Sequence, residues 1–274
     1  MFRQPIPFDA CRVIDKPELA QQFKPTVYMH RKSRYIPMDV DDYIRYCEPD
    51  TWGKVFKNEV THLRPNMEEL ADVQEVLEPT VHALVTQVVD EDHPLRGYFL
   101  VHYIMFYANQ PDTHICCGRP WCFRVCGSGH EADLEWISVL VEPDARKIRA
   151  TFYACHGLRE AQWVNRTLEN PYDRPNVFMA LDTHASFPTG GWKWRLWGSH
   201  VDKCPRNRGC LRKTSPLGYK LKVLDQEHPW LAYKGRMARG IRSLGAPGRL
   251  DLPAVADPLF SSGSQFRRRF FRCR

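Results

Sequence analysis

The sequence lacks several features, and each absence narrows the class of protein. It has no run of 18 or more apolar residues, which argues against a transmembrane helix. The stretch from Met1 to Pro7 lacks the apolar segment of a secretory signal. Neither a G-x-x-x-x-G-K-[ST] nor a G-x-G-x-x-G motif occurs, so nothing indicates a nucleotide cofactor. Internal repeats and low-complexity tracts are also missing, which excludes repeat architectures.

The composition is that of a globular chain with a basic end. The 274 residues are 43% hydrophobic and 12% aromatic, enough for one large core or two small ones. The net charge of +7 is local, because residues 234–274 hold ten Lys and Arg against two Asp. That segment therefore carries +8, and the first 233 residues are close to neutral. We expect one domain over residues 1–233 and a basic, extended arm over 234–274.

The arm ends in cations interleaved with aromatic residues. Its last arginines are Arg267, Arg268, Arg269, Arg272 and Arg274, with Phe270 and Phe271 between them. Such a segment suits an anionic partner such as a membrane, a nucleic acid or an acidic protein. The alternative is a solvated tail that aids solubility.

Ten cysteines are present, and four of them form a cluster. These are Cys116, Cys117, Cys122 and Cys126. The cluster is a candidate zinc or thiol site, although its spacing lacks the paired C-x-x-C knuckles typical of zinc proteins. Without a secretory signal, free thiols are the default expectation.

Hydrophobic periodicity predicts a mainly β (α+β) protein. The predicted strands are 98–107, 134–141, 148–154 and 177–181, with a short strand also expected within 19–29. Residues 98–107 are apolar on both faces and should form a central strand. Asn66 and Glu69 form a capping-box signal before a helix that ends at Pro79. We expect an antiparallel β-sandwich with a few peripheral helices.

Residues 129–135 hold the best candidate for a functional centre. On a strand, Asp133 and Glu135 would lie on one face, roughly 7 Å apart along the chain. With His130 at the mouth of that strand, these ligands suit a divalent cation, Mg, Ca or Mn. The alternative is an exposed strand edge whose charges face water or pair with arginine. Glu131, His156 and His184 are candidates to support this site or join it.

Three segments resemble the vacuolar protein sorting-associated protein 62 family. They are residues 23–41, which contain the Tyr35-Ile36-Pro37 step and the Val40-Asp41 pair, residues 129–141, and residues 177–188. The last segment is similar to that family's strand running into a Ser-His-Ala-Ser-Tyr-Pro turn. In order and spacing the resemblance spans about residues 19–215.

The heptapeptide from Gly129 to Glu135 also resembles the GHRHDWE signature of necrosis- and ethylene-inducing-like proteins. That group has a sandwich fold and binds a divalent cation. The resemblance implies His130, Asp133 and Glu135 as cation ligands, whereas Ala132 and Leu134 stand where the signature has His and Trp.

Three functions follow as expectations. The first is a non-enzymatic binding or structural protein, an intracellular or virion component of a larger assembly such as a virus particle or a membrane-trafficking complex. The second is a metal-dependent hydrolase, in which a cation activates water and His184 or Glu131 moves protons. The third, implied by the second resemblance, is a lipid-binding, cytolysin-like protein.

Overall fold

The structure is a computed structural model of the whole chain. It describes residues 5–30, 33–47, 63, 65–74, 77–111, 114–116, 122–124, 129–154, 162–165, 174–181, 183–189, 192–194, 201–203, 214–228, 231, 233 and 237. The basic arm lies outside the described residues apart from Met237.

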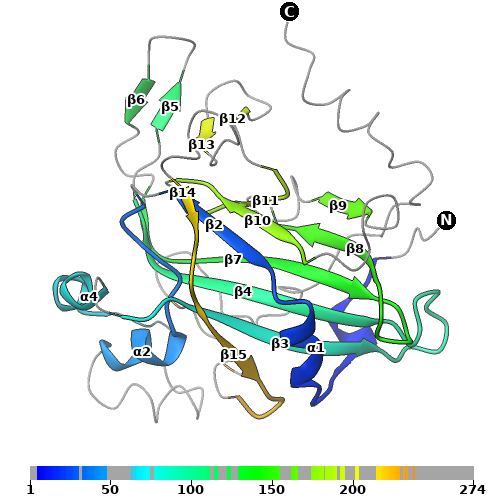
Figure 1. The fold of residues 1–274 in the computed structure, drawn as a ribbon. Helices are drawn as coiled ribbons and strands as arrows, with labels where there is room; N and C mark the ends of the chain where they lie inside the picture. The colour runs from blue at the N-terminus through cyan, green and yellow to red at the C-terminus, as the bar shows by residue number, and fades with distance from the viewer. Residues whose placement is uncertain are drawn as a thin grey trace, which may run out of the picture.

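The chain is mostly β, and its largest element is a seven-stranded sheet (Figure 1). The strands are β1 (Cys11–Val13), β3 (Thr80–Val88), β4 (Phe99–Gln110), β7 (His130–Val141), β8 (Ile148–Tyr153), β9 (Gln162–Asn165) and β15 (Lys220–Leu224). The order is β1-β3-β4-β7-β8-β9, with antiparallel neighbours throughout. β15 also pairs with β3, but in parallel.

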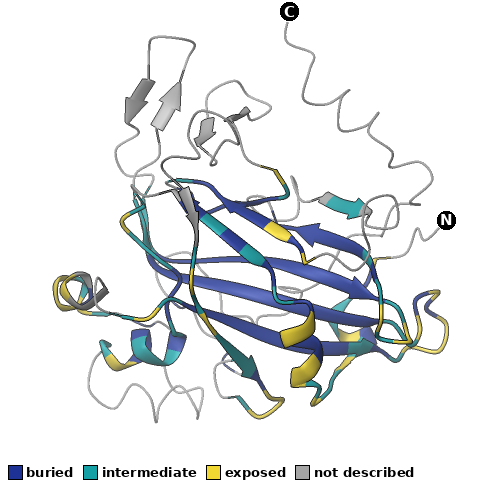
Figure 2. Cartoon of the chain, in the orientation of Figure 1, coloured by how far each residue is buried: buried dark blue, intermediate teal, exposed yellow. Residues whose placement is uncertain are grey.

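The centre of this sheet is the long antiparallel pair of β4 and β7. Residues 99–108 of β4 are all buried, because both faces of the strand are covered (Figure 2). The prediction of a central strand here is confirmed. β7 begins earlier than the expected 134 and ends at the turn that starts at Glu142, where Ala145 N donates to Glu142 O at 2.8 Å.

A second, four-stranded sheet is built from distant parts of the sequence. Its order is β11 (Ser186–Phe187), β10 (Asn176–Met179), β2 (Thr26–His30) and β14 (Thr214–Pro216). β10 and β2 are parallel, as are β15 and β3, so the pairing is mainly but not purely antiparallel. Two short pairs complete the strands, β5 (His114–Cys116) with β6 (Cys122–Arg124) and β12 (Trp192–Trp194) with β13 (Val201–Lys203).

The helices of the described residues are short and peripheral. They are η1 (Phe8–Ala10), α1 (Pro17–Gln22), α2 (Val40–Arg45) and α4 (Met67–Gln74). The predicted N-cap is confirmed at α4, where Glu69 N donates to Asn66 Oδ1 at 3.4 Å. The reciprocal bond of a capping box does not form, because Asn66 N donates to Tyr46 O and the Glu69 carboxylate accepts from Asn66 Nδ2. The strand expected within 19–29 begins only at Thr26. The residues before it form α1, which starts at Pro17 because proline is favoured in the first turn of a helix.

Two apolar cores lie on opposite faces of the large sheet. One contains Ile104, Phe106 and Trp136 together with Tyr43 and Ile44 of α2, and we call it the α2-side core. The other contains side chains of both sheets, and we call it the shared core. The shared core includes Val101, Tyr103, Ile137, Val139, Val27, Met29, Val177 and Met179. None of the described helices is long and apolar enough to cross a membrane.

Candidate functional site

β7 brings Asp133 and Glu135 to the same face of the large sheet. Their partners across the β4–β7 ladder are Tyr107 and Met105, and both partners belong to the shared core. Each acid is only 6% exposed. Burying a carboxylate among apolar side chains is costly unless charge or hydrogen bonds compensate, so these two acids need partners inside the protein.

His130 is held by the backbone of its own strand. Its Nδ1 lies 2.8 Å from Ala132 O and 3.3 Å from Glu131 O. Ala132, between His130 and Asp133, has a φ of 51°, in the left-handed region that residues other than glycine rarely adopt. The regular alternation of side chains is therefore interrupted between the histidine and the two acids.

Asp133 instead pairs with His184, which comes from the turn between β10 and β11. His184 Nδ1 lies 3.0 Å from Asp133 Oδ2, and the imidazole is 1% exposed. The turn is closed by Ala180 N, which donates to Ala185 O at 3.0 Å, and His184 within it has a φ of 53°. A strained, buried histidine held by a carboxylate is an arrangement often found at functional sites.

Tyr107 completes this buried group, which we call the Asp133 cluster: Tyr107, Asp133, Glu135 and His184. The Tyr107 and His184 rings are stacked, with centroids 3.9 Å apart and planes 6° apart. Burial raises the pKa of the Tyr107 phenol well above its ordinary value, and the Asp133 and Glu135 carboxylates raise it further. The phenol therefore stays protonated. Its oxygen is buried, and no hydrogen bond to it is present in the described part of the chain.

The Asp133 cluster can hold or move a proton, and it can present oxygen ligands. A carboxylate at Nδ1 favours the tautomer that carries its proton there, which leaves the lone pair on Nε2. That nitrogen could then accept a proton or bind a metal. Across the described residues, however, no group of three or more His, Cys, Asp or Glu side chains is arranged to hold a metal ion. A cation at His130, Asp133 and Glu135 stays a prediction.

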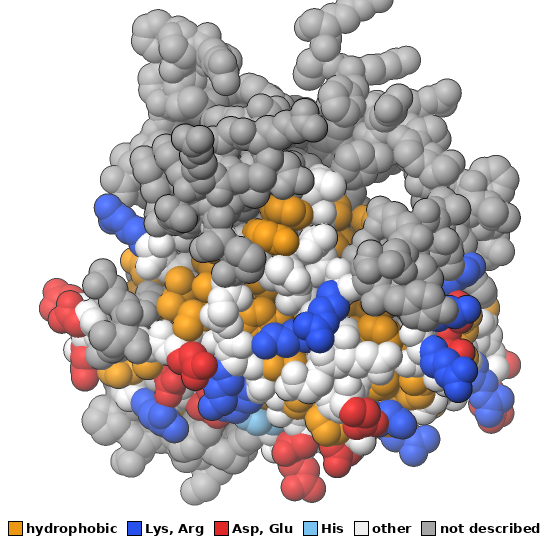
Figure 3. Space-filling model, viewed as in Figure 1, with side chains coloured by type: hydrophobic (Ala, Val, Ile, Leu, Met, Phe, Trp, Pro, Cys, Tyr) orange, Lys and Arg blue, Asp and Glu red, His pale blue; other side chains and the backbone are white. Residues whose placement is uncertain are grey.

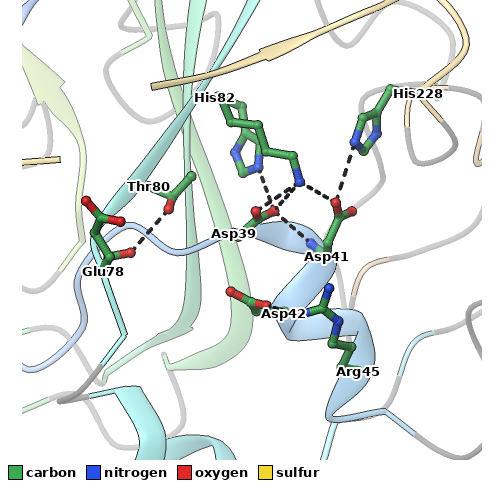
Figure 4. A network of polar contacts seen from close by, with 9 residues as sticks. Asp39, Asp41, Asp42, Arg45, Glu78, Thr80, His82 and His228 are labelled. Atoms are coloured by element: carbon green, nitrogen blue, oxygen red, sulfur yellow. Dashed lines mark hydrogen bonds and ion pairs between the residues drawn. The ribbon is translucent and has the colours of Figure 1, made fainter. Parts of the chain in front are cut away.

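A second cluster of charged side chains lies at the β3 edge of the large sheet (Figure 4). We call it the Asp39 cluster, and its members are Asp39, Asp41, His82, Lys222 and His228. Lys222 Nζ donates to Asp39 Oδ2 at 2.9 Å and also to Asp41 Oδ2. His82 Nε2 lies 3.1 Å from Asp39 Oδ1, and His228 Nε2 lies 3.6 Å from Asp41 Oδ2.

The pKa values in this cluster follow from burial and from the pairing. Burial opposes ionisation of Asp39, but the hydrogen bonds of His82 and Lys222 outweigh it and hold the pKa of that carboxyl well below its usual range. Burial would lower the pKa of Lys222, yet the hydrogen bonds to Asp41 and Asp39 raise it. Burial lowers the pKa of His82 in spite of Asp39, so this imidazole is neutral.

A third polar group is enclosed in the large sheet. His102 Nδ1 lies 2.7 Å from Ser138 Oγ, and its Nε2 lies 3.3 Å from Thr86 Oγ1. Burial lowers the pKa of His102 to about 4. Because the contacts of His102 among the described residues are hydroxyls and not carboxylates, we interpret this group as a neutral hydrogen-bonded link between β3, β4 and β7.

The remaining predicted residues divide between those described and those not. Glu131 is half-buried and pairs with Asn109 across the ladder. Cys116 and Cys122 are register partners in the β5–β6 pair, but only their backbone is described. The residues outside the described part of the chain are Cys117, Cys126, His156, Arg267, Arg268, Arg269, Arg272 and Arg274.

Sequence reasoning missed the Asp39 cluster and the polar group around His102. Asp39 is 43 positions from His82 and 183 from Lys222 along the chain. The one local signal was an acid just before a short helix, since Asp39 Oδ1 caps α2 by accepting from Asp41 N at 3.0 Å. Cap residues are common, so this signal does not indicate a charged cluster.

Comparisons with protein-family models, curated proteins and solved structures find no significant match to this chain. The resemblances of single segments therefore stay expectations.

Proposed function

We propose that this chain is a non-enzymatic binding or structural protein, with a rigid β-sandwich body and a basic arm that holds an anionic partner. The observation that carries the proposal is that buried and half-buried polar side chains pair across the fold. Asp133 pairs with His184, and Asp39 pairs with His82 and Lys222, so each pair joins segments far apart in the sequence. Such links hold distant segments together, which suits a structural role.

The sandwich part of the proposal rests on the shared core. Side chains from both sheets, such as Val101 of β4 and Val177 of β10, belong to this one apolar cluster and are 0% exposed. Burial of apolar surface contributes about 25 cal/mol per Å², so this layer would supply much of the stability. A platform of this kind suits a component of a larger assembly, such as a virus particle or a trafficking complex.

A divalent cation would add to that rigidity. The donor set fits in part, because Asp133 and Glu135 share a face and the Tyr107 hydroxyl oxygen beside them is buried without a hydrogen bond in the described structure. Hard oxygen ligands of this type favour Mg, Ca or Mn. Bound there, the ion would neutralise two buried carboxylates.

The arm is tested with a polyanion as the probe. We expect the full chain to bind heparin and anionic phospholipid vesicles, and deletion of residues 264–274 to weaken both most strongly at low salt. Neutral phosphatidylcholine vesicles are the control surface. Binding that is insensitive to salt, or equal in the truncated chain, would contradict the proposal.

One observation favours a second candidate function, a metal-dependent hydrolase. The Asp133–His184 pair is the arrangement that prepares an imidazole to accept a proton from water or to bind a metal. Manganese-dependent hydrolysis of an activated ester or phosphoester, lost in Asp133→Asn, would support this candidate over the structural one. Equal rates in the parent protein and the variant would exclude it.

A further inference from the structure

The C-terminal part of the described chain runs beside β3 as β15, at one edge of the large sheet (Figure 1). We call its described residues the strap: 217–228, 231, 233 and 237. The strap starts on β2, where Leu217 N donates to Val27 O at 2.8 Å. It ends in the α2-side core, where Tyr43 Oη donates to Met237 O at 3.0 Å. Between these points lies β15.

The strap lies at the edge of the large sheet, where it can open without the central strands. Among the described strands, β15 pairs with β3 alone, whereas β4 and β7 each pair on both sides. Local opening of a protein begins at elements with few partners, and central strands open only with global unfolding. Opening of the strap would leave the β4–β7 ladder intact.

Charged side chains hold the middle of the strap to the body. Lys222 of β15 lies between Asp39 and Asp41 of the α2 region, with its side chain 24% exposed (Figure 3 shows the mixed charges on this face). It shares one oxygen with His82, since Lys222 Nζ and His82 Nε2 each lie 3.1 Å from Asp39 Oδ1. Two potential cations thus meet at a single carboxylate oxygen.

We propose that Lys222 and His82 are alternative cationic partners of Asp39, so that proton binding by His82 releases the strap. In the closed state, Lys222 neutralises Asp39 and His82 stays uncharged. In the open state, Lys222 withdraws with the strap, water reaches the site, and imidazolium at position 82 takes over the pairing with Asp39.

The charges around His82 determine whether acidification favours the open or the closed strap. In the closed state, burial lowers the pKa of His82, and the nearby Lys222 charge lowers it further against the pull of Asp39. Opening removes both opposing causes, so the open state binds a proton at a higher pH than the closed state. Between the two pKa values, opening takes up one proton, and its equilibrium constant rises up to about tenfold for each unit by which the pH falls.

Several other charged groups lie on the described elements around the site. They are Asp41, Asp42, Arg45, Glu78, Lys220, Asp225, Glu227 and His228. Asp42 is paired with Arg45 at 2.6 Å, and Asp225 and Glu227 are exposed. His228 belongs to the strap and lies 3.6 Å from Asp41 Oδ2, whereas His82 belongs to β3, so substitutions can test the two histidines separately.

The test is hydrogen exchange of the full chain at pH 7.5, 6.5 and 5.5, corrected for the intrinsic pH dependence of exchange. We expect the opening constant of residues 220–224 to rise severalfold to tenfold per unit of acidification. Amides of β4 and β7 report global unfolding, which is itself acid-dependent through His102 and His82, so their opening constants should stay well below that of β15 at each pH. Constant or increasing protection of β15 on acidification would overturn the proposal, as would equal opening constants for β15 and β4 at all three pH values.

Substitutions of His82, His228 and Lys222 separate the contribution of each side chain to strap opening. In His228→Gln the acid-induced opening should persist, and in His82→Gln it should disappear. Lys222→Met should raise β15 exchange at pH 7.5 at least tenfold and flatten its pH dependence, because Asp39 is already free for His82. Lys220→Met is the matched control, since Lys220 is exposed on the same strand. If His82→Gln does not fold, Lys222→Met carries the test, and exchange equal to that of Lys220→Met contradicts the proposal.

Discussion

The imidazole of His184 lies flat against the phenol of Tyr107, with ring centroids 3.9 Å apart, while its Nδ1 lies 3.0 Å from Asp133 Oδ2. A ring held on its face and at one nitrogen has a single orientation. The direction of Nε2 is therefore set by the fold. This is the property that either a rigid structural link or a prepared proton acceptor requires.

Loss of the Asp133 carboxylate should destabilise the body. Asp133→Ala leaves a buried imidazole N–H without its acceptor, which typically costs about 1–3 kcal/mol of the free energy of unfolding. Urea denaturation at pH 7.5 measures the loss. Asp92→Ala is the control, because Asp92 is exposed in the loop between β3 and β4 and should change stability by less than about 0.5 kcal/mol.

Removal of the Tyr107 hydroxyl distinguishes an Asp133 cluster without a bound cation from one that binds a cation. Its oxygen is buried and accepts or donates no hydrogen bond in the described structure. Tyr107→Phe keeps the stacking on His184 and should be neutral or stabilising by about 1 kcal/mol in chelator-treated protein. If a cation binds the hydroxyl, the same substitution should instead reduce the stabilisation that added Mg or Ca gives. Thermal unfolding with and without metal measures both effects.

The predicted cation is tested by the melting temperature with and without a chelator. We expect a chelator to lower the melting temperature of the parent protein and added Mg, Ca or Mn to restore it, by the mass-action stabilisation of a ligand that binds only the folded state. In Asp133→Ala the difference between chelator and metal should vanish, whatever the baseline stability. An identical melting temperature with and without chelator in the parent protein would remove the cation from the proposed function.

Acid should weaken the fold before the carboxylates titrate. The pKa of His102 is lowered to about 4, from an ordinary value of 6.5. The folded state therefore resists a proton that the unfolded chain accepts, so the full contribution is present above pH 6.5 and is lost as pH falls toward 4. The loss for this group is about 3 kcal/mol, and His82 adds in the same direction.

Denaturant midpoints between pH 7.5 and 4.5 test this prediction. His102→Gln removes the titrating group and keeps a donor for Ser138, so its stability should fall less steeply with acid even if it is lower at pH 7.5. A slope equal to that of the parent protein would assign the acid sensitivity to other groups.

The candidate site was predictable only where local patterns apply. Alternation along 134–141 placed Asp133 and Glu135 on one face, because side-chain direction in a strand depends on the strand alone. The same reasoning could not show that this face is buried in the shared core. Nor could it show that His130 lies against the backbone carbonyl of Ala132 while Asp133 pairs with His184.

Local chemistry specified most of the elements: the Asn66 cap begins α4, an apolar run makes β4 central, and Pro17 starts α1. These outcomes follow from backbone sterics and the burial of apolar surface, which act over a few residues. The pairings that build the two clusters form only on folding, when Asp133 meets His184 and Asp39 meets both His82 and Lys222. Charge pairing depends on distance in space, and no spacing along a chain encodes a meeting of side chains up to 183 residues apart.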